Sequence, residues 1–118
     1  MKSLIYIKTT ANTINKDGNK MKNNNIRVEQ IEPNQFIIHT PDKVVFQSYY
    51  SIIAVLDDRD NAHPLTLGRD WDYSRTTLKY LYKFLDKYTH YNFEHSKQHI
   101  QKIIDSGDGV IQYDANLK

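Results

Sequence analysis

The sequence predicts an α+β protein: an antiparallel meander sheet of about five strands, followed by two helices and a last strand that can return to the sheet. Short β-rich segments separated by turn residues fill the chain from residue 26 to residue 67, which favours antiparallel neighbours. From residue 74 the apolar residues recur at helical spacing instead. The length of 118 residues fits a single domain.

The first 25 residues differ in composition from the rest. They contain five lysines against one aspartate, a net charge of +4, so the remaining residues carry a net charge of −2 and the overall +2 comes from this segment. Residues 4–7 are apolar and short enough for an edge strand, whereas residues 9–25 are rich in asparagine and lysine. We expect residues 1–25 to form a flexible basic segment and residues 26–118 to form the α+β domain.

The strands are predicted from β-branched and aromatic runs bounded by turns. Pro33 and Pro41 each lie in a turn between two such runs, and an acidic loop precedes the last short run, which Gly68 ends. The run at residues 49–56 is the longest and predicts a central strand. The predicted strands are residues 26–31, 35–39, 43–47, 49–56 and 65–67, with residues 110–113 as the last strand.

Two helices follow the strands. Residues 74–88 carry apolar side chains at helical spacing, and Ser74, or Asp72 before it, is a suitable N-cap. The second helix is predicted from about residue 93 to residue 106, with Asn92 as its cap and Gly107 as its stop.

Composition excludes several classes of function. The chain has no cysteine, so it can hold neither a disulfide nor a thiolate metal or redox site. Its longest apolar run has five residues against the ~20 needed to span a bilayer, and no signal-peptide segment is present. These observations predict a cytosolic protein without a membrane partner. The sequence also lacks a glycine-rich phosphate loop and a nucleophile elbow, so we expect no catalytic residues and no enzymatic activity.

The corner between the last predicted meander strand and the first helix contains the only tryptophan, Trp71. An indole at such a corner is typical of a core anchor. The charged and aromatic residues around it suit a protein contact surface, because arginine and tyrosine bury much area at modest entropic cost. With the first two lysines of the helix, they form the predicted partner-binding set: Arg69, Asp70, Trp71, Asp72, Tyr73, Arg75, Lys79 and Lys83.

Two charged features allow alternative interpretations. Arg75, Lys79, Lys83 and Lys87 step by four along one helix face, which suits either a solvated face or contact with a nucleic-acid backbone. The acidic loop at residues 57–60 is explained by turn chemistry, or it pairs with a basic protein surface as a phosphate mimic would.

Histidine provides the one metal candidate. His95 and His99 are four residues apart on the predicted second helix, and His90 lies just upstream. Two imidazoles on one helix face are compatible with zinc, although the segment lacks the glutamate of the H-E-x-x-H metalloprotease motif. Ordinary surface histidines are the alternative, so zinc is the only cofactor that we consider, and only as a structural ion.

One stretch of sequence resembles a known group of proteins. The segment FQSYYSIIA at residues 46–54, followed by WDYS at residues 71–74 and T-T-x-K-x-L at residues 76–81, is similar to small uncharacterised proteins encoded by phages and mobile elements of Gram-positive bacteria. The resemblance covers roughly residues 26–112. Proteins of this size and setting include anti-CRISPR inhibitors, which are compact, lack catalytic motifs and bind a large host nuclease through charged and aromatic surface.

The resemblance implies a binding protein that inhibits a host defence nuclease by occlusion, in particular an anti-CRISPR inhibitor of a type II CRISPR effector. Its partner would be a host protein in the bacterial cytoplasm. The alternative is a small nucleic-acid-binding accessory protein that uses the basic helix face.

Overall fold

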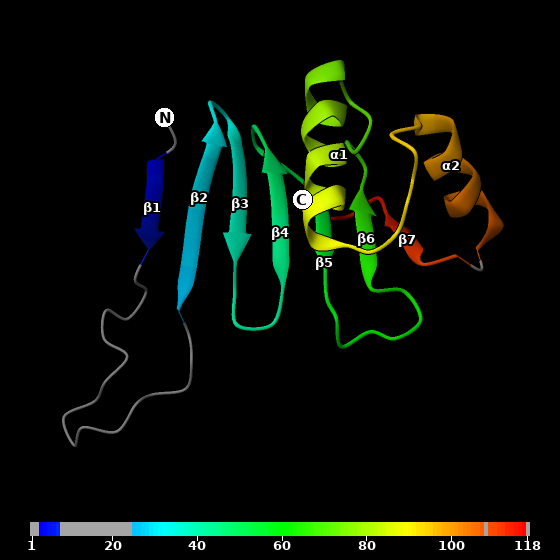
Figure 1. The fold of residues 1–118 in the computed structure, drawn as a ribbon, viewed down its shortest axis with the longest axis horizontal. Helices are drawn as coiled ribbons and strands as arrows, with labels where there is room; N and C mark the ends of the chain where they lie inside the picture. The colour runs from blue at the N-terminus through cyan, green and yellow to red at the C-terminus, as the bar shows by residue number, and fades with distance from the viewer. Residues whose placement is uncertain (1–2, 8–24, 108, 118) are drawn as a thin grey trace.

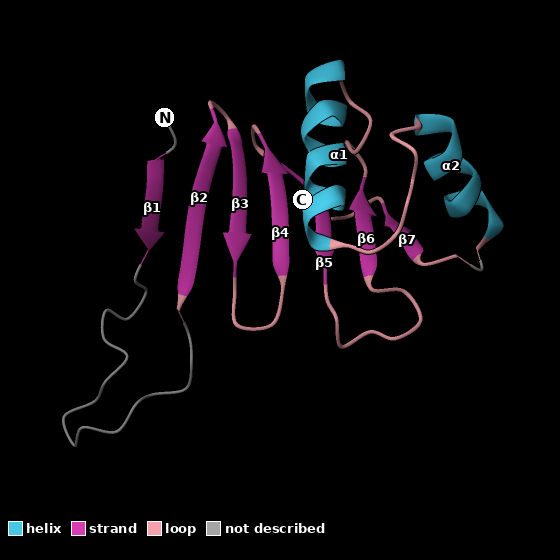
Figure 2. Ribbon diagram, viewed as in Figure 1, coloured by secondary structure: helices cyan, strands magenta, loops and turns pink. Residues whose placement is uncertain are grey.

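The computed structural model describes residues 3–7, 25–107 and 109–117, and within them the chain forms one seven-stranded sheet with two helices (Figures 1 and 2). The predicted α+β class is confirmed, and the strands follow one another across the sheet in sequence order. The elements are β1 Ser3–Ile7, β2 Ile26–Glu32, β3 Gln35–His39, β4 Val44–Ser48, β5 Ser51–Leu56, β6 Leu65–Gly68, α1 Arg75–Tyr88, α2 Lys97–Ser106 and β7 Ile111–Asp114.

The sheet is antiparallel from β1 to β6, as a meander with short turns requires. β7 is the exception, because the chain passes through both helices after β6 and then adds β7 parallel to β6. The last strand therefore does return to the sheet. The edge strand expected near residues 4–7 is also confirmed as β1, whereas nearly all of the stretch expected to be flexible, residues 9–25, lies outside the described residues.

The hydrophobic core lies between one face of the sheet and the two helices. Phe46 in the centre of β4 stacks on Phe84 of α1 with ring centroids 6.0 Å apart, and both side chains are buried. Ile100 of α2 and Ile111 of β7 extend the same buried cluster to the other end of the sheet. Neither helix in the described part of the chain has the length and apolar character needed to cross a membrane.

α1 begins where the sequence places it. Ser74 is the N-cap, and its hydroxyl accepts a hydrogen bond from the backbone N–H of Thr77 at 3.1 Å. Trp71, in the corner before the cap, is 3% exposed and belongs to the core, so its predicted role as an anchor is confirmed. The indole therefore offers little surface of its own to a partner, although it forms part of a groove beside α2.

α2 begins later than predicted. The helix starts at Lys97 with Ser96 as its N-cap, not at residue 93 with Asn92 as the cap. Glu94 and His95 have φ values of 58° and 47°, which place both residues in the left-handed region and interrupt any helix through them. Asn92 instead accepts a hydrogen bond from the backbone N–H of Glu94 within this turn. The end of α2 at Gly107, which has φ 73°, agrees with the prediction.

Residues 49 and 50 were predicted to lie in the central strand, which is wrong. They form the two-residue turn between β4 and β5, because Ser48 pairs directly with Ser51 across it. The high β-propensity of two tyrosines is overridden here by the register of the strands on either side.

Trp71 is buried and Tyr73 is exposed, so we expect their replacement by alanine to affect stability differently. We expect Trp71→Ala to reduce the free energy of unfolding by about 3–5 kcal/mol, because it removes a large buried ring. Tyr73→Ala, which removes a ring that is 74% exposed two residues away, is expected to change stability by no more than about 0.5 kcal/mol. Denaturant unfolding measures both. Equal losses in the two variants would contradict the anchoring role of Trp71.

Candidate functional site

A hollow in the described surface lies at the start of α1, beside the turn between β4 and β5. It has a volume of about 570 Å³ and is open on one side. Figure 1 shows why these segments meet: α1 begins above the end of the central strands at which β4 ends and β5 begins, and at which β6 leads into the corner. Its lining consists mainly of tyrosine, serine and threonine side chains: Ser48, Tyr49, Tyr50, Ser51, Ile53, Asp70, Tyr73, Ser74, Thr76 and Thr77.

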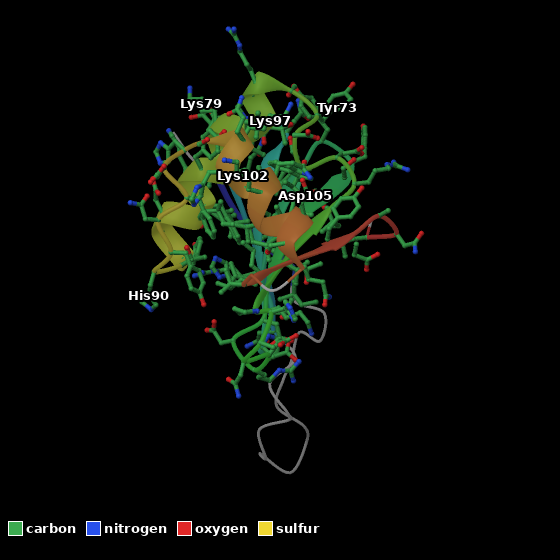
Figure 3. All side chains as sticks on the ribbon, turned by 90° about the vertical axis from the view of Figure 1, so that its right-hand side faces the viewer. Tyr73, Lys79, His90, Lys97, Lys102 and Asp105 are labelled. Carbon is green, nitrogen blue, oxygen red and sulfur yellow. The ribbon has the colours of Figure 1, made fainter. Side chains whose placement is uncertain are left out.

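Three exposed tyrosines rim this hollow. Tyr50 is 96% exposed at the tip of the β4–β5 turn, and Tyr49 beside it is also exposed. Tyr73 faces them from the corner before α1 and points outward at the upper end of the molecule in Figure 3. We call the hollow and its rim of Tyr49, Tyr50 and Tyr73 the tyrosine hollow.

The backbone of the turn is held in an unusual conformation. Tyr49 has φ 55°, in the left-handed region that a bulky aromatic residue rarely occupies. Its backbone N–H donates to the carbonyl of Asn34 at 2.7 Å, and the side-chain amide of Gln47 donates to its carbonyl at 2.8 Å. These bonds hold the turn in a conformation that asparagine or glycine would adopt with less strain.

The floor of the hollow is polar and buried. The hydroxyls of Ser48 and Thr77 share a hydrogen bond of 3.1 Å, which joins β4 to the first turn of α1. Gln35, which pairs with Ser48 across β3 and β4, is also buried, and its side-chain amide has no hydrogen-bond partner among the described residues. A polar floor of this kind costs stability relative to an apolar one.

One carboxylate contributes charge to the tyrosine hollow. Asp70 accepts hydrogen bonds from Arg69 Nε at 3.2 Å and from the Ser51 hydroxyl at 2.7 Å. Two hydrogen bonds lower the pKa of Asp70 below its ordinary value, the larger effect coming from Arg69 and the smaller from Ser51. The carboxylate therefore stays ionised at neutral pH. Asp72 points away toward α2 and pairs with Lys97 at 3.4 Å.

The predicted partner-binding residues therefore separate into three groups. Asp70 and Tyr73 line the tyrosine hollow. Arg69, Trp71 and Asp72 line a separate groove beside α2. The basic residues of α1, Arg75, Lys79 and Lys83, lie on another surface. Sequence reasoning missed Tyr49 and Tyr50 as site residues. The only local signal for them is the placement of two tyrosines between Ser48 and Ser51, where a hairpin turn is geometrically required.

The basic face of α1 borders a second, shallower groove of about 440 Å³. Arg75, Lys79 and Lys83 are exposed along it, and none of them belongs to an ion pair among the described residues. The ammonium groups of Lys79 and Lys83 each lie 5.3 Å from the ring centroid of Tyr80. These three residues of the predicted stripe are thus exposed cations outside any ion pair among the described residues, while Glu29 and Glu32 lie near Lys83 and Lys87 in a neighbouring groove.

The three candidate metal ligands do not form a cluster. His95 lies in the turn before α2 rather than on the helix with His99, so the four-residue helical spacing on which the zinc hypothesis depended is wrong. The His95 ring stacks on Tyr82 and its Nε2 lies 2.7 Å from Asp86, while His90 projects to the left below the helices in Figure 3. No group of three or more metal-binding side chains occurs among the described residues.

The acidic loop after β5 is engaged in ion pairs. The Asp57 carboxylate accepts from the Arg59 guanidinium at 3.0 Å and lies 3.8 Å from Lys43 Nζ, and Arg59 also pairs with Asp42 at 3.1 Å. The Arg59 side chain is the main cause that lowers the pKa of Asp57 from 3.8 to about 2. An Asp57 paired in this way is a loop-closing residue rather than a free phosphate mimic.

A family model matches residues 6–106, that is, most of the chain, and is described as a family of unknown function, DUF8033. A search of curated proteins found no match. A search of solved structures found none either.

The Asp57 network predicts a pH-dependent stability difference. Because the folded pKa of about 2 lies below the ordinary 3.8, the contribution of the carboxylate is complete above pH 3.8 and is lost as the pH falls through 2. We expect Asp57→Asn to lower Tm slightly at pH 7 and to leave it unchanged at a pH below the folded pKa. Asp58→Asn, at the exposed neighbour, is the control. A similar decrease in both variants would contradict the network.

Proposed function

The chain belongs to the DUF8033 family, whose function is unknown, and from the geometry of the tyrosine hollow we propose that it is a stoichiometric protein-binding module rather than an enzyme. The observation that carries the proposal is the pair of exposed tyrosines at a strained two-residue turn, facing a third exposed tyrosine across a hollow. Tyrosine provides large, rigid contact area with few rotatable bonds, and the surrounding serines and threonines provide adaptable hydrogen bonds.

Residues at the tyrosine hollow lower the stability of the fold, and this supports a role for the hollow in binding another protein. A left-handed backbone at Tyr49 and a buried amide without a described partner at Gln35 both oppose stability; Tyr49 lines the hollow, and Gln35 pairs across the sheet with Ser48, which also lines it. Departures from the rules of stable folding tend to concentrate at functional sites. Asparagine or glycine at position 49 would form the turn with less strain, so folding alone does not explain a tyrosine there.

The chemistry of the hollow favours a basic protein surface as its partner. Tyrosine faces attract arginine and lysine, and the serine and threonine hydroxyls around them can accept hydrogen bonds from guanidinium and ammonium groups. A nuclease binds its nucleic acid through such cationic surface. Together with the resemblance to phage and mobile-element proteins, this supports an inhibitor that occludes a host defence nuclease in the bacterial cytoplasm, most specifically an anti-CRISPR inhibitor of a type II CRISPR effector.

A DNA-cleavage assay with a purified, guide-loaded type II effector tests this proposal. We expect the chain to inhibit cleavage, and we expect Tyr50→Ala combined with Tyr73→Ala to raise the half-inhibitory concentration by about tenfold or more, since central tyrosines are typical hot spots. Tyr91→Ala combined with Tyr113→Ala is the matched control, because these rings are 39% and 44% exposed and lie outside the hollow.

Two results of this assay would count against the proposal. Absence of inhibition by the unmodified chain at any concentration would exclude this effector as the partner. Full inhibition by the Tyr50 and Tyr73 double variant would exclude the tyrosine hollow as the contact surface.

The groove on α1 supports a second candidate function, contact with a nucleic-acid backbone. Its specific observation is the convergence of Arg75, Lys79 and Lys83 on one groove, where their charges are not neutralised by described acidic residues. Cations spaced one helical turn apart can follow successive phosphates.

The second candidate predicts a salt-dependent gel shift. Three phosphate contacts would give a slope of log affinity against log salt of about −3 on duplex DNA, and Lys79→Ala combined with Lys83→Ala would reduce that slope by about 2. Lys102→Ala, at an exposed position on α2, is the control (Figure 3). Binding that is independent of salt, or equally weakened by the control, would contradict contact through this groove.

A further inference from the structure

The groove along α1 has an aromatic wall in addition to its basic residues. Tyr82 of α1 and His95 of the connection between the two helices both line the groove. Their rings stack with centroids 5.0 Å apart and an angle of 3° between the ring planes. The chain returns beside α1 after the helix ends, and this brings His95 next to Tyr82 (Figure 1). Tyr82 packs against the core and His95 is exposed, so the groove presents a planar ring on a fixed support.

The described lining of this groove contains three basic side chains and no acidic one. Arg75, Lys79 and Lys83 follow one another at steps of four residues along α1, and each is exposed. At a rise of about 1.5 Å per residue, their backbone positions extend over about 12 Å of helix. Leu78 lies half-buried beside them. A ligand in the groove therefore meets a row of cations along a surface that is otherwise aliphatic and aromatic.

Acidic side chains of the described residues border the groove without lining it: Glu29, Glu32, Asp72 and Asp86. Glu29 and Glu32 lie in the neighbouring groove between α1 and β2. Asp72 pairs with Lys97 at 3.4 Å, and Asp86 lies 2.7 Å from His95 Nε2 and so holds the ring in place. The basic residues of α1 are therefore the charges that a ligand in the groove meets directly, together with the ring of His95.

We propose that this groove binds single-stranded nucleic acid, with one base stacked on the His95 ring and the flanking phosphates on the basic residues of α1. The inference rests on the second candidate function, contact with a nucleic-acid backbone, and it specifies the form of nucleic acid. Bases of a single strand expose their faces, and proteins bind such strands by combining a basic groove with aromatic rings on which bases stack. In a duplex the base faces are stacked on neighbouring base pairs, so only phosphates are left for this groove to contact.

The dimensions and chemistry of the groove favour a strand over a free nucleotide or an acidic peptide. A row of cations about 12 Å long is matched by several successive phosphates, which one nucleotide does not provide. An acidic peptide would also pair with the cations. It has no general counterpart to the planar face that every base offers to an exposed aromatic ring. Stacking of this kind is tolerant of sequence, so we expect the groove to bind strands of different sequence.

Fluorescence anisotropy of the full chain with a labelled oligothymidine of about 12 nucleotides tests the proposal. An abasic strand and a duplex of the same length are the comparison ligands. We expect the oligothymidine to bind about tenfold more tightly than the abasic strand, because only the oligothymidine adds a stacked base to the phosphate contacts. The duplex is expected to bind more weakly than the oligothymidine for the same reason.

His95→Ala separates base stacking from a structural role of the ring. We expect this variant to bind the oligothymidine about tenfold more weakly and to bind the abasic strand unchanged, because the phosphate contacts do not need the imidazole. His90→Ala removes an exposed histidine that does not line the groove, and it is the matched control. An equal loss of affinity for both strands in His95→Ala would show that the ring only supports the groove, and it would overturn the proposal.

The comparison ligands distinguish failure of this proposal from failure of the second candidate function. Equal affinity for the oligothymidine and the abasic strand, or tighter binding of the duplex, would overturn the single-strand proposal and leave backbone contact standing. Absence of binding to every nucleic acid at low salt would overturn both. Polyglutamate that displaces the labelled strand as well as unlabelled oligothymidine does would overturn the proposal and assign the groove to an acidic peptide.

Discussion

Two short helices can cover only part of a seven-stranded sheet, and this limit on coverage determines where the surfaces of the molecule lie. Helices of 14 and 10 residues are roughly 21 Å and 15 Å long, and each is about as wide as two strands. They bury one face of the sheet from β3 to β7, where the hydrophobic core lies. The stacking of Phe46 on Phe84 marks the centre of the covered region.

The position of α1 on the sheet also places the tyrosine hollow, which lies at the ends of the central strands β4 and β5. Trp71 fills the corner between β6 and α1, and this directs the first turn of the helix toward the end of β4. The turn that carries Tyr49 and Tyr50 lies at this end of the strands, and both tyrosine side chains remain exposed there. Exposure of the tyrosines is therefore a consequence of where α1 must begin to bury its own apolar face.

Most of the fold could be predicted from the sequence because its signals are local. The alternation in β2 and β3 and the Ser74 cap depend on neighbouring residues and were identified correctly. The errors fall where distant contacts decide the outcome. The register between β4 and β5 converts two tyrosines into a turn, and left-handed residues at 94 and 95 delay α2 although nothing in their local sequence forbids a helix.

The candidate site was predicted only in part for the same reason. Asp70 and Tyr73 come from the corner that the sequence singled out, but Tyr49 and Tyr50 come from a hairpin about twenty residues earlier and meet the corner only through the sheet. The predicted pairing of His95 with His99 is wrong because it required one continuous helix through both residues, whereas α2 begins only at Lys97. The spacing of residues along the chain predicts a site when all of its residues lie on one helix, strand or loop. It does not predict a site whose residues come from two elements that the fold brings together.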